Sequence, residues 1–153
     1  MSSIDETIQT DGIKKMTNLY ETDFVEWTIK QAQALNNHDI KALDWNNLKE
    51  EIEDLGKEQI HSVSSFVKKL IEHKLKLDYS SDIYRRNHWQ TEINNFQDEI
   101  ERRLTKTLLN KVDIDKEYER AKRLVLSEYK LDLPDRCPYS FADLMLRLPE
   151  NQQ

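Results

Sequence analysis

Glycine and proline are almost absent from most of this chain. The two glycines are Gly12 and Gly56, and all three prolines follow residue 133. A β-rich protein of 153 residues would usually need more glycines at its turns. The scarcity therefore predicts long helices joined by short polar connections.

The segment from Leu43 to Gly56 carries the clearest helical signal. Asp44 is a suitable N-cap, because its carboxylate can accept hydrogen bonds from N–H groups of the first turn. An apolar stripe follows at steps of three, four and three: Trp45, Leu48, Ile52 and Leu55. Acidic side chains occupy the other faces: Glu50, Glu51, Glu53 and Asp54.

The same stripe resumes beyond Gly56 and reaches Tyr79. A helix from Trp45 to Tyr79 would have 35 residues, and about 50 Å of length at 1.5 Å per residue. A globule of this chain length is only about 40 Å across. We therefore expect that the helix kinks near Gly56, or that part of it protrudes and packs on something else.

Three further helices and a short C-terminal one follow from similar patterns. The first spans about 24–37, with Asp23 as its cap, Glu26 completing a capping box, and an inner face of Phe24, Trp27, Thr28, Gln31 and Leu35. The others span about 87–110, 115–130 and 141–146. The fold class is thus all-α, a bundle of four main helices with a short C-terminal helix. We expect Trp27, Trp45 and Trp89 in its core.

The length suits one domain. Residues 1–18 are polar and lack a clear period, so we expect a flexible N-terminal arm there. Residues 19–150 would then form a single helical domain.

The formal net charge is −6, and it is unevenly placed. Residues 1–60 hold 6 basic and 13 acidic side chains, a net −7, and the remainder carries a net +1. An acidic chain is a poor candidate for sequence-independent nucleic-acid binding, which needs a basic surface. The asymmetry is compatible with electrostatically guided self-association, and also with two solvated faces of different sign.

Three observations favour a cytoplasmic location. Cys137 is the only cysteine, which excludes an intramolecular disulfide and suits a reducing compartment. No stretch approaches 18 consecutive apolar residues, so we expect no membrane span. The segment from Met1 to Met16 lacks the apolar region of a signal peptide.

Four segments of the chain together match the pattern of one family. They are Tyr20-Glu-Thr-Asp-Phe-Val-Glu-Trp27; Leu43 to Gly56; His73-Lys-Leu-Lys76 with Trp89 beyond it; and Pro134 to Tyr139 followed by Leu144. In this order and spacing the chain resembles the domain of unknown function 29 family, small all-helical bacterial proteins common in cyanobacteria. The resemblance covers roughly residues 20–146. It implies an all-α fold, and it carries no catalytic residues and no cofactor.

A metal site is the first candidate that the acidic residues suggest. Glu58 and His61 have the Glu-x-x-His spacing of di-iron helical bundles. Such a site needs a second Glu-x-x-His, but the other histidines are preceded three positions earlier by Leu35, Leu70 and Arg85. We therefore interpret the run as a solvated acidic face and predict no metal.

An alternative is a Mg²⁺-dependent hydrolase of phosphate esters such as nucleotides. Glu50 with Glu53, or Glu51 with Asp54, would face Asp98 and Glu101 on another helix and hold the ion. Because 29 of 153 residues are acidic, about five or six acidic pairs at this spacing are expected by chance. The pattern is thus a weak indication of catalysis.

The lone thiol is the last candidate. Arg136 lies next to Cys137 and could lower its pKa. A catalytic cysteine also needs a base, and no histidine can be placed near it from the sequence, so a packed structural thiol is favoured.

No complete catalytic set emerges, and an enzyme is the less favoured interpretation. We predict a small interaction or regulatory protein that acts through helix faces, binds a protein partner or its own copy, and uses no cofactor, nucleic acid or membrane. One half of a toxin–antitoxin or similar regulatory pair is a third hypothesis.

Overall fold

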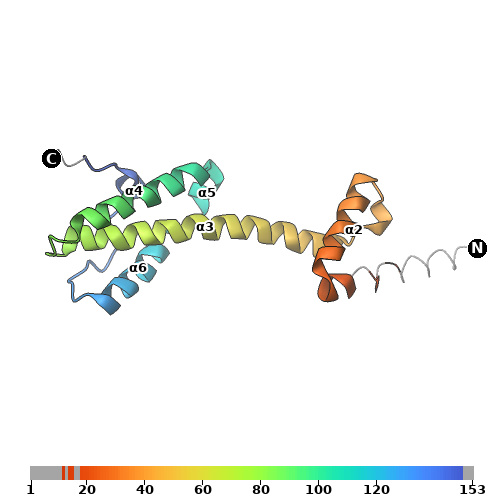
Figure 1. The fold of residues 1–153 in the computed structure, drawn as a ribbon, viewed down its shortest axis with the longest axis horizontal. Helices are drawn as coiled ribbons and strands as arrows, with labels where there is room; N and C mark the ends of the chain where they lie inside the picture. Colours follow the sequence, from red (N-terminus) through yellow and green to blue (C-terminus); the bar gives the residue numbers. More distant parts are fainter. Residues whose placement is uncertain (1–11, 13, 16–17, 150–153) are drawn as a thin grey trace, which may run out of the picture. The chain divides into compact units, whose positions relative to one another are not determined.

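The computed structural model describes residues 12, 14–15 and 18–149, which contain helices and no strand. The elements are α2 (Phe24–Asn36), the 3-10 helix η1 (Ile40–Ala42), α3 (Trp45–Tyr79), α4 (Arg86–Arg103), α5 (Lys106–Lys111), α6 (Ile114–Glu128) and α7 (Phe141–Met145) (Figure 1). The all-α class is thereby confirmed, with four long helices and a short C-terminal one. The predicted flexible arm lies almost entirely outside the described residues.

The chain divides into two units, Met1–Gly56 and Lys57–Gln153, which we call unit 1 and unit 2. Helix α3 contributes its first turns to unit 1 and its remainder to unit 2. Whether residues 19–150 behave as a single domain stays a prediction. Gly56 lies within the helical residues of α3, and a Cβ built on it would meet no atom within 4 Å. This glycine therefore neither ends the helix nor makes room for a neighbour.

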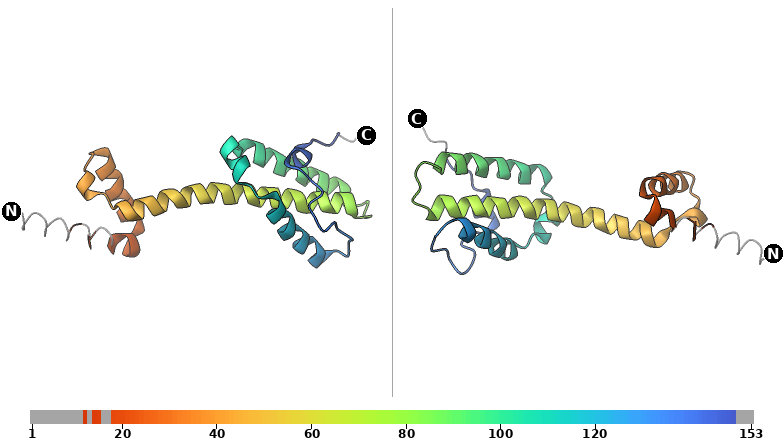
Figure 2. Two further views of the ribbon diagram at one scale, coloured as in Figure 1. Left: turned by 180° about the vertical axis from the view of Figure 1, so that it is seen from behind. Right: turned by 60° about the horizontal axis from the view of Figure 1, so that its bottom comes forward.

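Unit 2 contains the main hydrophobic core. Helices α4 and α6 run alongside the second half of α3, as the right-hand view in Figure 2 shows. Their inward side chains, with two from the C-terminal tail, form one buried cluster: Val63, Val67, Leu70, Ile71, Leu75, Leu77, Ile93, Ile100, Tyr118, Ala121, Val125, Leu133 and Leu144. Full burial of a Leu, Ile or Val side chain stabilises the fold by about 1.5–3 kcal/mol. Six of these side chains come from α3, and five come from α4 and α6.

The helix predicted over residues 87–110 is in fact two helices. Leu104 ends α4 with an extended backbone, and Thr105 begins α5 by accepting a hydrogen bond from Leu108 N at 3.2 Å. A threonine hydroxyl can replace helical hydrogen bonds in this way, which favours a new helix start at that point. The expectation of one uninterrupted helix there was wrong.

The C-terminal tail is attached to α4 by a buried amide. Gln97 Nε2 donates to Leu144 O at 2.9 Å and to Leu146 O at 3.1 Å. Both hydrogen bonds join residues that are far apart in the sequence. Ser140 and Asp143 form a complete capping box at the start of α7. Leu144 is thereby held in the core of unit 2.

Unit 1 consists of α2, η1 and the start of α3. The Asp23 carboxylate accepts from Glu26 N at 3.1 Å, so the predicted cap of α2 is confirmed. The predicted inner face of α2 was partly wrong. Trp27 and Gln31 are buried, but Phe24 and Leu35 are exposed and Ala34 is buried instead.

Candidate functional site

A buried polar cluster joins α2 to the start of α3. Trp27 Nε1 donates to Asp44 Oδ2 at 3.0 Å, and Asn47 Nδ2 donates to the same oxygen at 2.8 Å. Gln31 Oε1 accepts from Asp44 N at 2.8 Å, while Gln31 Nε2 donates to Ala42 O at 3.2 Å. Hydrogen bonds to a charged group contribute about 1.5–3 kcal/mol each. This cluster therefore fixes the position of α2 against the residues that begin α3.

A second contact lies one turn further along α3. The hydroxyl of Tyr20 donates to Glu51 Oε1 at 2.6 Å. This hydrogen bond, followed by desolvation, raises the pKa of Tyr20 to about 12. The ring of Tyr20 also packs edge-on against Trp27, with the ring centroids 4.9 Å apart. Glu51 is thus held in place by a side chain from the segment before α2.

The apolar stripe at the start of α3 lies open to solvent. Trp45 is 62% exposed, Ile52 is 67% exposed and Leu55 is 63% exposed, while Leu48 is half-buried. Their spacing of three and four residues places all four on one side of the helix. We call Trp45, Leu48, Ile52 and Leu55 the α3 apolar face. The expectation that Trp45 belongs to the core was wrong, whereas Trp27 and Trp89 are buried as predicted.

The reason for this difference lies in what fills unit 1. Among its described residues, the buried apolar side chains are Trp27, Ala34 and Leu43, which come from α2 and from the residue before Asp44. A helical period indicates which side chains share a face, but burial needs another element on top of that face. On the second half of α3, α4 and α6 supply that cover.

Exposed apolar side chains are concentrated in unit 1. Among the described residues, eight of the fifteen large exposed hydrophobic side chains lie between residues 24 and 55. Besides the α3 apolar face, they include Phe24, Val25, Ile29, Leu35 and Ile40. Unit 1 therefore exposes apolar area that a folded monomer normally covers.

Acidic side chains border the α3 apolar face. Residues 45–56 contain one lysine, Lys49, and four acids: Glu50, Glu51, Glu53 and Asp54. Lys49 Nζ lies 3.5 Å from Glu53 Oε1, so the lysine is already paired within the helix. This part of α3 therefore has a net charge of −3, one lysine against four acids, and Glu51 is the acid that lies at the edge of the α3 apolar face.

The residues of the hydrolase alternative are distributed over two helices. Glu50, Glu51 and Asp54 lie on α3, whereas Asp98 lies on α4. Arg147 Nη2 lies 2.6 Å from Asp98 Oδ1 and 3.1 Å from Glu101 Oε2, so the charges of these two acids are offset by the tail. In the part of the chain that the structure describes, no group of three or more His, Cys, Asp or Glu side chains could hold a metal ion. The role of these acids in catalysis stays a prediction.

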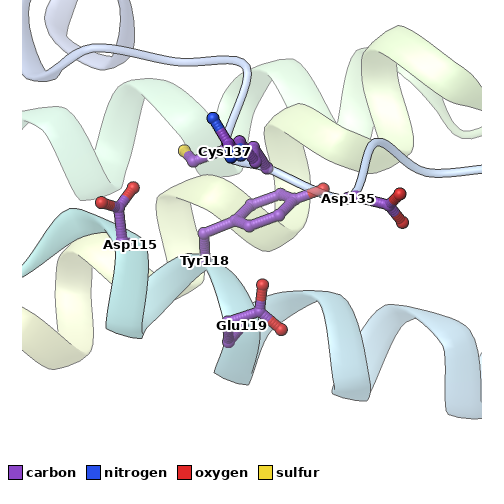
Figure 3. A pocket seen from close by; sticks show the side chains of 6 residues that line it. Asp115, Tyr118, Glu119, Asp135 and Cys137 are labelled. Atoms are coloured by element: carbon purple, nitrogen blue, oxygen red, sulfur yellow. The ribbon is translucent and has the colours of Figure 1, made fainter.

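The two remaining sequence candidates have separate surroundings. Glu58 and His61 are both exposed on α3. Cys137 Sγ donates to Tyr139 O at 3.3 Å, and burial raises the pKa of the thiol. The thiol lies at a hollow of about 290 Å³ lined by Asp115, Tyr118, Glu119, Asp135 and Arg136 (Figure 3). A raised pKa leaves less reactive thiolate at neutral pH, as befits a structural cysteine.

The polar cluster of unit 1 was not predicted as a unit. The sequence carried part of the signal, because Trp27 and Gln31 are one turn apart on the inner face predicted for the first helix. Asp44 was interpreted as a helix cap, but its carboxylate also binds two side chains. The partner of a buried indole N–H seventeen residues away cannot be found from local spacing.

Comparison with known proteins places the chain in a family. The family model described as Domain of unknown function DUF29 matches residues 19–147, so the chain belongs to this family and the resemblance found in the sequence is confirmed. No curated protein and no solved structure matches it. Among the described residues, no helix has both the length and the apolar character that a membrane span requires.

Proposed function

We propose that this member of the DUF29 family is a protein-interaction module that binds its partner through the α3 apolar face. One observation carries the proposal: Trp45, Ile52 and Leu55 lie on one side of α3 with most of their surface in solvent. Contiguous exposed apolar patches on soluble proteins commonly mark interaction sites. Tryptophan is also the residue most enriched among those that dominate binding energies.

The energetic balance supports binding at this surface. Burial of apolar surface contributes about 25 cal/mol per Å², so a partner that covers these three side chains gains several kcal/mol. The same side chains contribute little to the folded monomer, because they are already exposed there. Their apolar character therefore has no evident use in the stability of unit 1.

The buried polar cluster supports the proposal in a second way. Trp27, Gln31 and Asp44 hold α2 against the residues that begin α3, and Tyr20 binds Glu51 one turn beyond. A surface held in its binding conformation loses less conformational entropy when a partner binds. The start of α3 is thus suited to present a fixed apolar face.

The test compares two matched substitutions in cells that naturally contain the chain. Ile52→Asp places a charge on the α3 apolar face, and Ile83→Asp places one at an equally exposed isoleucine of unit 2. We expect a discrete complex with an identifiable partner that is lost in Ile52→Asp and retained in Ile83→Asp. Equal behaviour of both variants would contradict the proposal.

Self-association is a separate proposal, supported by the 35-residue length of α3 and compatible with the uneven charge of the chain. Sedimentation velocity at micromolar concentration tests it, and a monomer throughout would remove it. We also propose a cytoplasmic location, because a single cysteine suits a reducing compartment.

A further inference from the structure

We propose that the partner segment seated on the α3 apolar face is a basic amphipathic helix. This inference rests on the proposed function and adds the chemistry of the occupant. Three properties of the surface carry it: the spacing of its apolar side chains, the sign of the charges beside them, and the poor match of the face to itself.

The spacing of the apolar side chains suits a helix as the occupant. Trp45, Leu48, Ile52 and Leu55 follow one another at steps of three, four and three, the pattern of a seam between two packed helices. Side chains at this spacing insert between the side chains of a facing helix. An amphipathic helix that lays its apolar side on such a seam is a recurring mode of recognition.

The charges beside the seam define the polar side of that occupant. Glu51 is three residues after Leu48 and four before Leu55, so it lies at the edge of the seam, where its carboxylate is held by the Tyr20 hydroxyl. On the other edge, Lys49 lies next to the seam with Glu53 paired to it at 3.5 Å, whereas Glu50 lies on the opposite side of the helix. Lysine or arginine side chains that flank an apolar seam would meet the carboxylate of Glu51 at close range. The attraction would weaken as salt rises, because it lies at the surface.

The same charges disfavour a second copy as the occupant. In an antiparallel pairing of two α3 seams, the acidic edges meet, and Glu51 faces acids of the other copy. In a parallel pairing, Lys49 faces Asp44 of the other copy, but Asp44 is only 6% exposed and its carboxylate already accepts from Trp27 and Asn47. Neither arrangement places opposite charges together. A positively charged partner would avoid the repulsion between the acidic side chains of two copies.

Trp45 provides a direct readout of binding. It is the one largely exposed tryptophan of the three, since Trp27 and Trp89 are 2% and 3% exposed. The probe is a synthetic helical peptide with leucine at the seam positions and lysine beside them. We expect it to shift the emission of Trp45 to shorter wavelength and to protect the indole from a neutral quencher. Binding should weaken as sodium chloride is added.

Peptide and protein controls separate the two parts of the surface. A peptide with glutamate in place of lysine should fail to protect Trp45. A peptide of the same composition as the lysine peptide, with its leucines scattered around the helix, should also fail.

Ile52→Asp should weaken binding of the lysine peptide by about tenfold or more, and Ile83→Asp should leave it unchanged. Glu51→Gln keeps an acceptor for the Tyr20 hydroxyl but removes the charge at the seam edge, so it should weaken binding severalfold, with Glu119→Gln in unit 2 as the matched control. Trp45→Phe should remove the fluorescence change while a labelled peptide still binds.

The outcomes also distinguish the inference from the proposed function. A Trp45 that is open to the quencher but indifferent to the lysine peptide would overturn only the basic helix, as would equal binding of the glutamate or scattered-leucine peptide. Protection of Trp45 that grows with protein concentration, without any peptide, would show a second copy in that place. A Trp45 already shielded in the dilute monomer would overturn both proposals, because another part of the chain would then cover the face.

Discussion

The indole N–H of Trp27 and the carboxylate of Asp44 are joined by a buried hydrogen bond of 3.0 Å. Both side chains are nearly inaccessible to solvent, and the same carboxylate oxygen also accepts from Asn47. Removal of this carboxylate would leave buried donors without partners. The relationship therefore gives the most direct test of how unit 1 is held together.

Asp44→Ala should destabilise unit 1 by about 2–4 kcal/mol, because the Trp27 N–H is left buried and unpaired. Hydrogen exchange resolved by peptide is the measurement, and we expect faster exchange in α2 and in residues 42–48. Exchange in residues 63–77 of unit 2 should not change. Asp39→Ala, at an exposed position, is the control. Exchange in α2 as slow as in the unmodified chain would contradict the role given to Asp44.

Trp45 and Trp89 should respond in opposite ways to truncation. Trp89→Ala should cost about 3–5 kcal/mol, because the side chain is buried and a cavity would remain. Trp45→Ala should change the free energy of unfolding by no more than about 0.5 kcal/mol, since its side chain is mostly in solvent. Urea denaturation followed by circular dichroism compares the two. A large loss of stability in Trp45→Ala would mean that the α3 apolar face is covered in solution.

Gln97→Leu should detach the C-terminal tail from α4. The substitution removes the amide that donates to Leu144 O and Leu146 O. We expect a loss of about 1–3 kcal/mol, because buried carbonyl groups lose their donor. Limited proteolysis should then cleave near residues 140–148 before it cleaves α4. Gln90→Leu, which removes an amide that donates to the exposed Pro149 O, is the matched control. Unchanged protection of the tail would show that apolar packing of Leu144 suffices.

The stability of unit 2 should depend on pH through His73. Burial lowers the pKa of this ring, which also packs edge-on against Phe96 with centroids 5.1 Å apart. Below its ordinary pKa of about 6.5, the unfolded chain takes up a proton that the folded chain resists. This contribution to stability is therefore present above that pH and is lost as pH falls through the folded pKa.

Titration of the His73 ring by NMR measures this directly. The midpoint of the His73 titration should lie below that of free histidine. His73→Gln should reduce the slope of the free energy of unfolding against pH in the acid range. Glu72 acts in the opposite direction, because burial raises its pKa and its contribution is lost as pH rises. Observation of the imidazole itself separates the two groups. A His73 midpoint at or above the value of free histidine would contradict the effect of burial.

Local patterns predicted the helices well where a cap or a long stripe was present. Helix α3 begins at Trp45 and ends at Tyr79 as expected, and Asp23 caps α2. The break between α4 and α5 was missed, because the apolar stripe continues through Leu104 while the hydroxyl of Thr105 starts a new helix. An apolar stripe indicates which residues share a helix face. It does not reveal a short stretch in which the backbone leaves the helical conformation.

The candidate surface was visible in the sequence, but it was interpreted as core. The stripe of Trp45, Ile52 and Leu55 looks the same as the stripe that continues with Val63 and Leu70. In the folded protein the first stripe is exposed and the second is buried. The ion pair between Asp98 and Arg147 could not be predicted from local sequence patterns either, because forty-nine residues separate the two side chains.

The amino-acid order by itself determined that this protein is all-helical, because apolar residues recur once per turn and almost no glycine or proline interrupts them. It also determined which side chains share a face of each helix. The tertiary structure alone decided which of those faces are covered. Burial depends on whether a distant segment packs on a face, and neither the helical period nor local charge specifies that segment.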